Sequence, residues 1–179
     1  TAPQVHGDTR SAQQAALELL RGARSVLLTG HVRPDGDCIG AQAALARVLV
    51  ALGKEVVILN PDPPEPQFDY LSDHLDYGAF DGGEVPAHDL TVLLDCSELS
   101  RCGDLAPALA AAPTKKLVVD HHIHVGDEWW DATFADVTAS ATGVLVYRIA
   151  RALEVELDEV AARGVFTSIV TDTGWFKYS

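Results

Sequence analysis

The sequence is poor in basic residues and has no methionine at all. Lysine and arginine number 13 against 26 aspartates and glutamates, which gives a net charge of −13. This balance disfavours tight binding of long nucleic acid, because such binding depends on neutralising many phosphates with cationic side chains. It does not disfavour a short phosphorylated substrate, since bound metal ions can supply local positive charge. The missing methionine is expected of a processed or trimmed chain.

Cysteine is also scarce. Cys38, Cys96 and Cys102 are odd in number and form no CxxC pair, which argues against a disulfide framework or a zinc ribbon. We expect them to be small buried hydrophobic residues in a reducing compartment. No apolar run approaches the roughly 18–20 residues of a membrane span, and the N-terminus lacks a signal-peptide pattern. The sequence therefore predicts a soluble, cytoplasmic protein with no membrane partner.

A glycine-rich phosphate loop is absent as well. Neither a GxGxxG motif nor a P-loop occurs anywhere in the chain. This disfavours a nucleotide-binding α/β domain that works without metal ions. Carboxylates gathered at such a site would also repel phosphate unless cations were bound.

Apolar runs alternate between strand-like and helical patterns along the 179 residues, and the hydrophobic fraction of 47% is ample for a packed core. Strands are predicted at 25–29, 55–59, 90–94 and 116–119, and helices at 11–22, 38–52, 105–111, 139–153 and 158–171. Continuous valine and leucine strands joined by helices indicate an α/β fold, a parallel sheet covered on both faces. Residues 60–89 have weak periodicity and allow no firm prediction.

Four short segments place acidic and imidazole side chains at the ends of apolar runs. They are residues 31–37, 94–96, 120–122 and 171–174. The first three follow predicted strands, and ligands of parallel sheets bind beyond the carboxyl ends of strands, so we expect these segments to converge. Together the four segments offer four or five carboxylates and three imidazoles. Two divalent ions about 3.5–4 Å apart need this many donors, with one carboxylate shared between them.

Each segment also has an ordinary structural interpretation. The aspartates of 31–37 could cap the following helix beside a surface histidine, although the amides of that helix also favour an anion. Asp95 could cap a helix over 97–101, but a carboxylate ending a buried strand is costly unless paired or metal-bound. Residues 120–122 could form a solvated turn, and Asp172 alone is more typical of a cap.

The two adjacent histidines are expected to have different roles. His121 and His122 cannot easily bind one ion from regular structure, so we expect one to ligate and the other to contact substrate. Asp120 could orient a histidine and fix its tautomer. His124 is expected to be an ordinary loop residue.

Four motifs, taken in order, resemble the DHH phosphoesterase superfamily over nearly the whole chain. They are GHxxPDGD at 30–37, LD at 94–95, DHH at 120–122 and TDTGxF at 171–176. The most similar branch contains small oligoribonucleases and 3′-phosphoadenosine-5′-phosphate (pAp) phosphatases. The resemblance implies that residues 1–179 form a parallel-sheet DHH catalytic domain. It also implies that a C-terminal substrate-binding domain, DHHA1, is missing from this sequence.

The resemblance assigns roles to individual residues. It implies two divalent ions, with Mn²⁺ expected, one held by His31, Asp35 and Asp95 and the other by Asp37, Asp95, His121 and Asp172. A water activated by both ions would be the nucleophile, and His122, backed by Asp120, would contact the scissile phosphate. Arg101, Ser140, Thr142 and Lys177 are candidate substrate contacts.

The implied activity is metal-dependent hydrolysis of phosphate esters in short oligoribonucleotides or pAp. Inorganic pyrophosphatases, exopolyphosphatases and cyclic-dinucleotide phosphodiesterases share the metal site and remain alternatives. A pyrophosphatase should bring a strongly basic pocket, and few basic residues lie near the motifs. An inactive nucleotide-binding module is the alternative outside enzymes. The partners expected are a short RNA or phosphorylated nucleotide rather than a long duplex, and a homodimer stays open.

Overall fold

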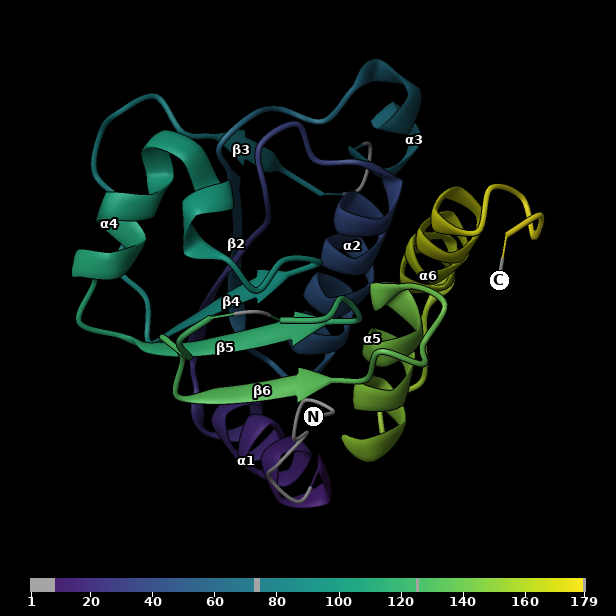
Figure 1. Cartoon of the computed structure of the whole chain (residues 1–179), viewed down its shortest axis with the longest axis horizontal. Coiled ribbons are helices and arrows are strands. Elements are labelled where there is room, and N and C mark those ends of the chain that lie inside the picture. The colour runs from purple at the N-terminus through teal and green to yellow at the C-terminus, as the bar shows by residue number, and fades with distance from the viewer. Residues whose placement is uncertain (1–8, 73–74, 125, 179) are drawn as a thin grey trace.

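The computed structural model describes residues 9–72, 75–124 and 126–178. Its centre is a six-stranded sheet in the order β3-β2-β1-β4-β5-β6, and every neighbouring pair is parallel (Figure 1). The strands are β1 Ser25–Thr29, β2 Glu55–Asn60, β3 Tyr77–Ala79, β4 Leu90–Leu94, β5 Lys115–Asp120 and β6 Ala132–Ala135. The predicted parallel α/β fold is confirmed.

Helices cover both faces of this sheet. The α-helices are α1 Thr9–Gly22, α2 Gly36–Ala51, α3 Asp69–Ser72, α4 Ala106–Ala111, α5 Thr142–Ala152 and α6 Glu159–Asp172, with 3₁₀ helices η1 Pro66–Phe68 and η2 Leu99–Leu105. Helices α1, α2 and α5 pack on one face, α6 packs against α2, and η2 with α4 covers the opposite face (Figure 1). Within the described ranges, no helix combines the length and the apolar character needed to cross a membrane.

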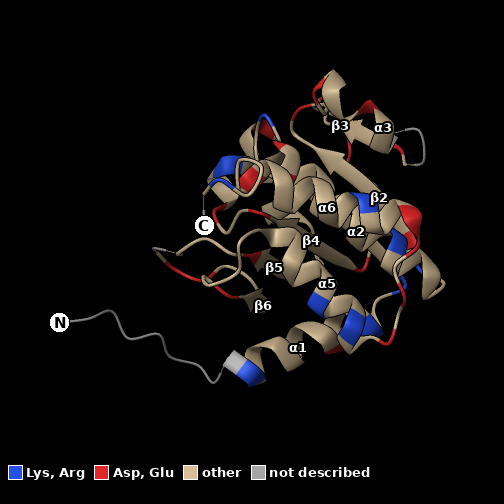
Figure 2. Ribbon diagram, turned by 90° about the vertical axis from the view of Figure 1, so that its right-hand side faces the viewer, with Lys and Arg blue, Asp and Glu red and all other residues tan. Residues whose placement is uncertain are grey.

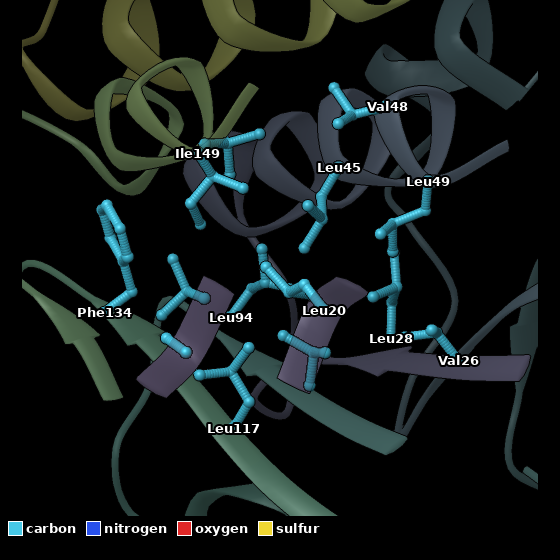
Figure 3. Close-up of a cluster of buried hydrophobic side chains, with 14 of the residues drawn as sticks. Leu20, Val26, Leu28, Leu45, Val48, Leu49, Leu94, Leu117, Phe134 and Ile149 are labelled. Carbon is cyan, nitrogen blue, oxygen red and sulfur yellow. The ribbon is translucent and has the colours of Figure 1, made fainter. Parts of the chain in front are cut away.

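The core lies in two layers, one on each side of the sheet. Successive strand residues point to opposite faces, as Leu27 and Leu28 show. Leu28 belongs to the larger layer, which Figure 3 shows between the strands and helices α1, α2 and α5. Leu27 belongs to the smaller layer, together with Leu105 and Leu109. Every residue of β4 is buried, which explains why its sequence is apolar except at Thr91.

Helix α2 is enclosed between the sheet and α6, and two glycines allow the two helices to touch. A Cβ on Gly40 would lie 2.4 Å from the carbonyl oxygen of Gly164, and a Cβ on Gly164 would lie 2.5 Å from that of Gly40. Backbone therefore packs directly on backbone. Because α2 begins and α6 ends beside the four motifs, this contact sets the position of both helices at the candidate site.

The structure differs from the sequence-based prediction in its shortest elements. Strands β3 and β6 have three and four residues and were not predicted, because such short segments carry little periodic signal. The helix predicted over 139–153 begins only at Thr142. Ala141 is extended, with φ −172° and ψ 158°, so the chain enters α5 at a sharp angle. The helix predicted over 105–111 begins at Ala106, after η2.

The contact between α2 and α6 gives a first prediction. Gly164→Ala should lower the free energy of unfolding by about 1–3 kcal/mol, because the methyl group meets backbone atoms that cannot move aside. Gly22→Ala is the matched control, since its Cβ would meet nothing within 4 Å. Urea denaturation of both variants measures the difference. Equal stability of the two variants would show that the helices separate without cost.

Candidate metal centre

The site lies where the strand order of the sheet reverses, between β1 and β4. In open parallel sheets, ligands bind outside the carboxyl ends of strands at such a switch point. Thr29 pairs with Leu93, so two residues further along His31 and Asp95 come side by side. Their closest atoms, His31 Nε2 and Asp95 Oδ2, are 3.5 Å apart. The register of two neighbouring strands thus joins the first two motifs.

The first group of possible metal ligands consists of His31, Asp35 and Asp95, whose ligand atoms all lie within 4.8 Å of one another. His31 is only 6% exposed, so it is not a surface histidine. Its Nδ1 lies 2.9 Å from the carbonyl oxygen of Val32, which leaves Nε2 to face Asp95. Asp35 does cap α2, because its Oδ1 accepts from the second and third following amides at 3.0 and 3.1 Å.

The second group consists of Asp37, His121 and Asp172. His121 Nε2 lies 3.3 Å from Asp37 Oδ2, 3.7 Å from Asp95 Oδ1 and 3.7 Å from Asp172 Oδ2. The other ring nitrogen, Nδ1, lies 3.1 Å from the carbonyl oxygen of Ala139. Nε2 is buried and makes no hydrogen bond within the described part of the chain. Buried polar atoms normally have partners, so a ring nitrogen facing three carboxylates indicates a place for a cation.

His122 is oriented by Asp120. Its Nδ1 lies 2.8 Å from Asp120 Oδ1, which also accepts from the backbone amide of His122 at 3.0 Å. Asp120 is buried, whereas about half of the His122 side chain is exposed. The same Nδ1 is 3.6 Å from Asp95 Oδ1, and a third possible ligand group joins Asp95, His121 and His122. The two adjacent histidines therefore differ: His121 points into the carboxylates and His122 lies at the rim.

The start of α5 donates hydrogen bonds to two of the carboxylates, Asp37 and Asp95. The sequence did not predict these hydrogen bonds. The backbone amides of Thr142 and Gly143 donate to Asp37 at 2.8 and 3.3 Å, and the Thr142 hydroxyl donates to Asp95 Oδ1 at 3.1 Å. Amides at a helix N-terminus favour a negative charge. Thr142, predicted as a substrate contact, is instead fully buried, and both of its donors bind carboxylates.

Ser168 of α6 completes this support. Its hydroxyl donates to Asp37 Oδ1 and accepts from the amide of Gly143 at 2.8 Å. A Cβ on Gly143 would lie 2.2 Å from Ser168 Oγ, so only glycine fits there. Ser168 and Asp37 are 131 positions apart in the sequence, and no local pattern marks the serine. In the sequence, only Ser140 and Thr142, predicted as substrate contacts, marked the start of α5 as part of the site.

The carboxylates perturb one another and His121. Burial raises the pKa of Asp95 well above its usual value, and the charges of Asp37 and Asp35 add to this effect. Burial also opposes ionisation of Asp37, but the nearby His121 ring and the hydrogen bonds from Ser168 and from the amide of Thr142 outweigh burial and lower the pKa of Asp37. Burial acts against protonation of His121, yet the Asp37 carboxylate, 3.3 Å from Nε2, raises the pKa of His121 to about 9. Protons and divalent cations therefore compete for the same atoms.

The remaining predicted substrate contacts lie around this cluster. Arg101, in η2, is exposed, and its carbonyl oxygen accepts from the amide of Val32 at 2.8 Å. Ser140 is exposed just before α5, and Lys177 is exposed beyond α6. Among the described residues, no hydrogen bond or ion pair joins these three side chains to the candidate ligands. Figure 2 shows basic segments spread over several elements, α1 and α5 among them.

Comparison with known proteins identifies the family of this chain. Residues 25–169 match the N-terminal domain of the DHH family. The chain belongs to the DHH family. A curated relative, the bifunctional oligoribonuclease and PAP phosphatase NrnA of Thermus thermophilus, is 31% identical over 161 residues, covering 86% of this chain and 45% of its own length.

A second curated relative and one solved structure carry different names. A probable manganese-dependent inorganic pyrophosphatase from Enterococcus faecalis is 26% identical over 159 residues, 85% of this chain and 49% of that protein. The crystal structure of an exopolyphosphatase-related protein from Bacteroides fragilis superposes with a TM-score of 0.87 at 24% identity, covering 98% of this chain and 53% of that one. This superposition supports the fold. The chain spans about half the length of the curated relatives it matches.

Removal of the Ser168 hydroxyl tests whether α6 positions Asp37. Ser168→Ala should weaken Mn²⁺ binding about 10- to 100-fold, the usual effect of deleting a residue that orients a metal ligand. Thr167→Ala is the control, because that hydroxyl lies on the same helix but pairs with Tyr70 at 2.6 Å. Isothermal titration calorimetry with Mn²⁺ measures both variants. Equal Mn²⁺ affinities of the two variants would show that Ser168 does not position Asp37 for metal binding.

Proposed function

We propose that this chain is a hydrolase domain that cleaves phosphate esters of short oligoribonucleotides and pAp with two divalent metal ions, Mn²⁺ being expected. The observation that carries the proposal is the position of Asp95 between two ligand groups. Its Oδ2 faces His31 at 3.5 Å, and its Oδ1 faces His121 at 3.7 Å. A carboxylate with one oxygen toward each group is the bridging ligand that a two-metal site needs.

The residues present fit such a pair of ions. The unpaired Nε2 of His121 and the mixture of carboxylate and imidazole donors suit Mn²⁺. His31, Asp35 and Asp95 would hold one ion, and Asp37, Asp95, His121 and Asp172 the other. When bound, the ions would supply Lewis-acid stabilisation of the phosphate and an activated water. A manganese dependence in the name of the Enterococcus relative supports the choice of metal.

His122 would act on the substrate rather than hold an ion. Its hydrogen bond to Asp120 is the largest influence on the pKa of His122 and raises it above the usual value of a histidine. A protonated, half-exposed imidazole at the rim can donate a proton or hydrogen bond to a phosphate oxygen or leaving group. Asp120 would hold the ring in place through Nδ1.

The charge distribution supports a nucleotide substrate over pyrophosphate or polyphosphate. An inorganic polyanion needs several cationic side chains besides the ions. The segments beside the ligands contribute only Arg33, Arg101 and Lys177 to the described surface. The name of the Thermus relative, oligoribonuclease and PAP phosphatase, also supports the nucleotide assignment.

Product analysis tests the proposed activity. With Mn²⁺, the protein should release AMP from pAp and mononucleotides from 5′-phosphorylated RNA di- and trinucleotides, with little phosphate from pyrophosphate. Phosphate from pyrophosphate alone would instead assign the pyrophosphatase activity. No turnover of any of these substrates, with Mn²⁺ bound, would contradict the proposal.

The separate roles of Asp95 and His122 give a sharper test. Asp95→Ala should abolish turnover and weaken both ion sites, because the shared ligand is lost. His122→Ala should retain both ions but lose about 10²- to 10⁴-fold in kcat, the usual contribution of a proton donor. His124→Ala is the control, since this loop histidine bonds Ser97 and belongs to none of the three ligand groups. Loss of one Mn²⁺ from His122→Ala in calorimetry would reverse the roles of the two histidines.

A further inference from the structure

The carboxylate cluster is bordered by exposed apolar side chains. Val32 and Ile123 each follow a histidine of the site, and Ile123 is 78% exposed. Trp175 and Phe176 follow Asp172, the last candidate ligand, and are 76% and 67% exposed. Three of the segments that carry ligands thus place a large apolar side chain in solvent next to a charged centre.

A compact turn fixes the two aromatic residues relative to α6. The Thr173 hydroxyl donates to the carbonyl oxygen of Ile169 at 2.6 Å and accepts from the amide of Phe176 at 3.0 Å. The carbonyl oxygen of Thr173 accepts from the amides of Lys177 and Tyr178 at 2.9 and 2.8 Å. These hydrogen bonds tie the segment to the last turn of the helix that carries Asp172.

The backbone of this turn is unusual for large side chains. Trp175 and Phe176 have φ values of 62° and 61°, in the left-handed region that costs free energy for residues other than glycine. Their exposure means that burial within the described chain does not offset this cost. The ring of Tyr178 behaves differently, because it packs over Gly174, where a Cβ would lie 2.6 Å from the ring. Strained residues of this kind concentrate at functional sites.

An acidic centre with an aromatic rim suits a ligand that is charged at one end and flat and apolar at the other. Pyrophosphate and polyphosphate have no apolar part and would gain nothing from the rim. A nucleobase can stack on aromatic side chains whatever its sequence, because every base has a π-face. Lys177 follows Phe176 in the sequence, with its Nζ 5.8 Å from the centre of the Tyr178 ring, and adds a cation to this segment.

We propose that Trp175 and Phe176 form a stacking platform for the base of a nucleotide whose phosphate lies at the candidate metal centre. This inference rests on the proposed function and deepens it, because it names the residues that favour a nucleotide over an inorganic phosphate.

Equilibrium binding separates this inference from the activity. Calorimetry with Ca²⁺ in place of Mn²⁺ would compare pAp with an abasic ribose 3′,5′-bisphosphate, and chromatography of the sample afterwards would check that pAp is intact. Wild-type protein should prefer pAp. Trp175→Ala and Phe176→Ala should each reduce this preference about tenfold, equal to about 1.4 kcal/mol, without changing affinity for the abasic ligand.

Two further variants control for nonspecific effects. Phe166→Ala removes a 56% exposed aromatic side chain from α6, away from the turn, and should leave the preference unchanged. Trp175→Phe keeps an aromatic face and should retain most of the preference.

The outcomes distinguish the two proposals. An unchanged preference in Trp175→Ala and Phe176→Ala would overturn the platform while leaving the activity intact. If these variants also lower the melting temperature well beyond Phe166→Ala, the rings pack against protein instead of a base. A reduced preference without any turnover of pAp by the wild type with Mn²⁺ would retain the platform and overturn the activity. Failure of pAp to bind would overturn both.

Discussion

Burying several carboxylates side by side is the constraint on which this structure depends. Asp37 and Asp95 are almost fully buried, and each has lost hydration while facing other negative charges. The protein offsets part of this cost with the amides at the start of α5, the hydroxyls of Thr142 and Ser168, and the His121 ring. His121 Nε2 and Asp120 Oδ2 still make no hydrogen bond within the described residues. A divalent cation held by the candidate ligands would satisfy His121 Nε2.

The architecture of the domain follows from bringing these groups together. Neighbouring parallel strands β1 and β4 place their following residues at one edge, and the N-terminus of α2 adds Asp35 and Asp37. Asp172 comes from the end of α6, which reaches the site because backbone packs on backbone at Gly40 and Gly164. A cluster drawn from four distant segments thus depends on the sheet register and on one close helix contact.

Much of the fold was predictable because strands β1, β2 and β5 each contain a short apolar run and β4 is apolar except at Thr91. The candidate ligands were also predictable, since three of the short motifs that contain them follow strands and the fourth ends a helix. The hydrogen bonds that hold Asp37 in place were not predictable, because Gly143 and Ser168 lie on helices far from Asp37 in the sequence. Thr142 was recognised as part of the site, but whether its hydroxyl faces substrate or Asp95 depends on where α5 begins. Strands β3 and β6 are too short to leave a pattern.

The exposure of Trp175 and Phe176 was likewise not predictable from the sequence. Trp175 and Phe176 belong to a recognisable motif, yet their exposure and left-handed backbone become visible only in three dimensions. The combination of an acidic centre, one half-exposed histidine and an aromatic border is what distinguishes this site from a simple helix cap or a solvated turn.

The central claim is that Asp95 is shared between two ions. Anomalous diffraction from crystals grown with Mn²⁺ measures this most directly. The account predicts two peaks about 3.5–4 Å apart, both within bonding distance of Asp95. A single peak, or a pair in which Asp95 contacts only one ion, would contradict it.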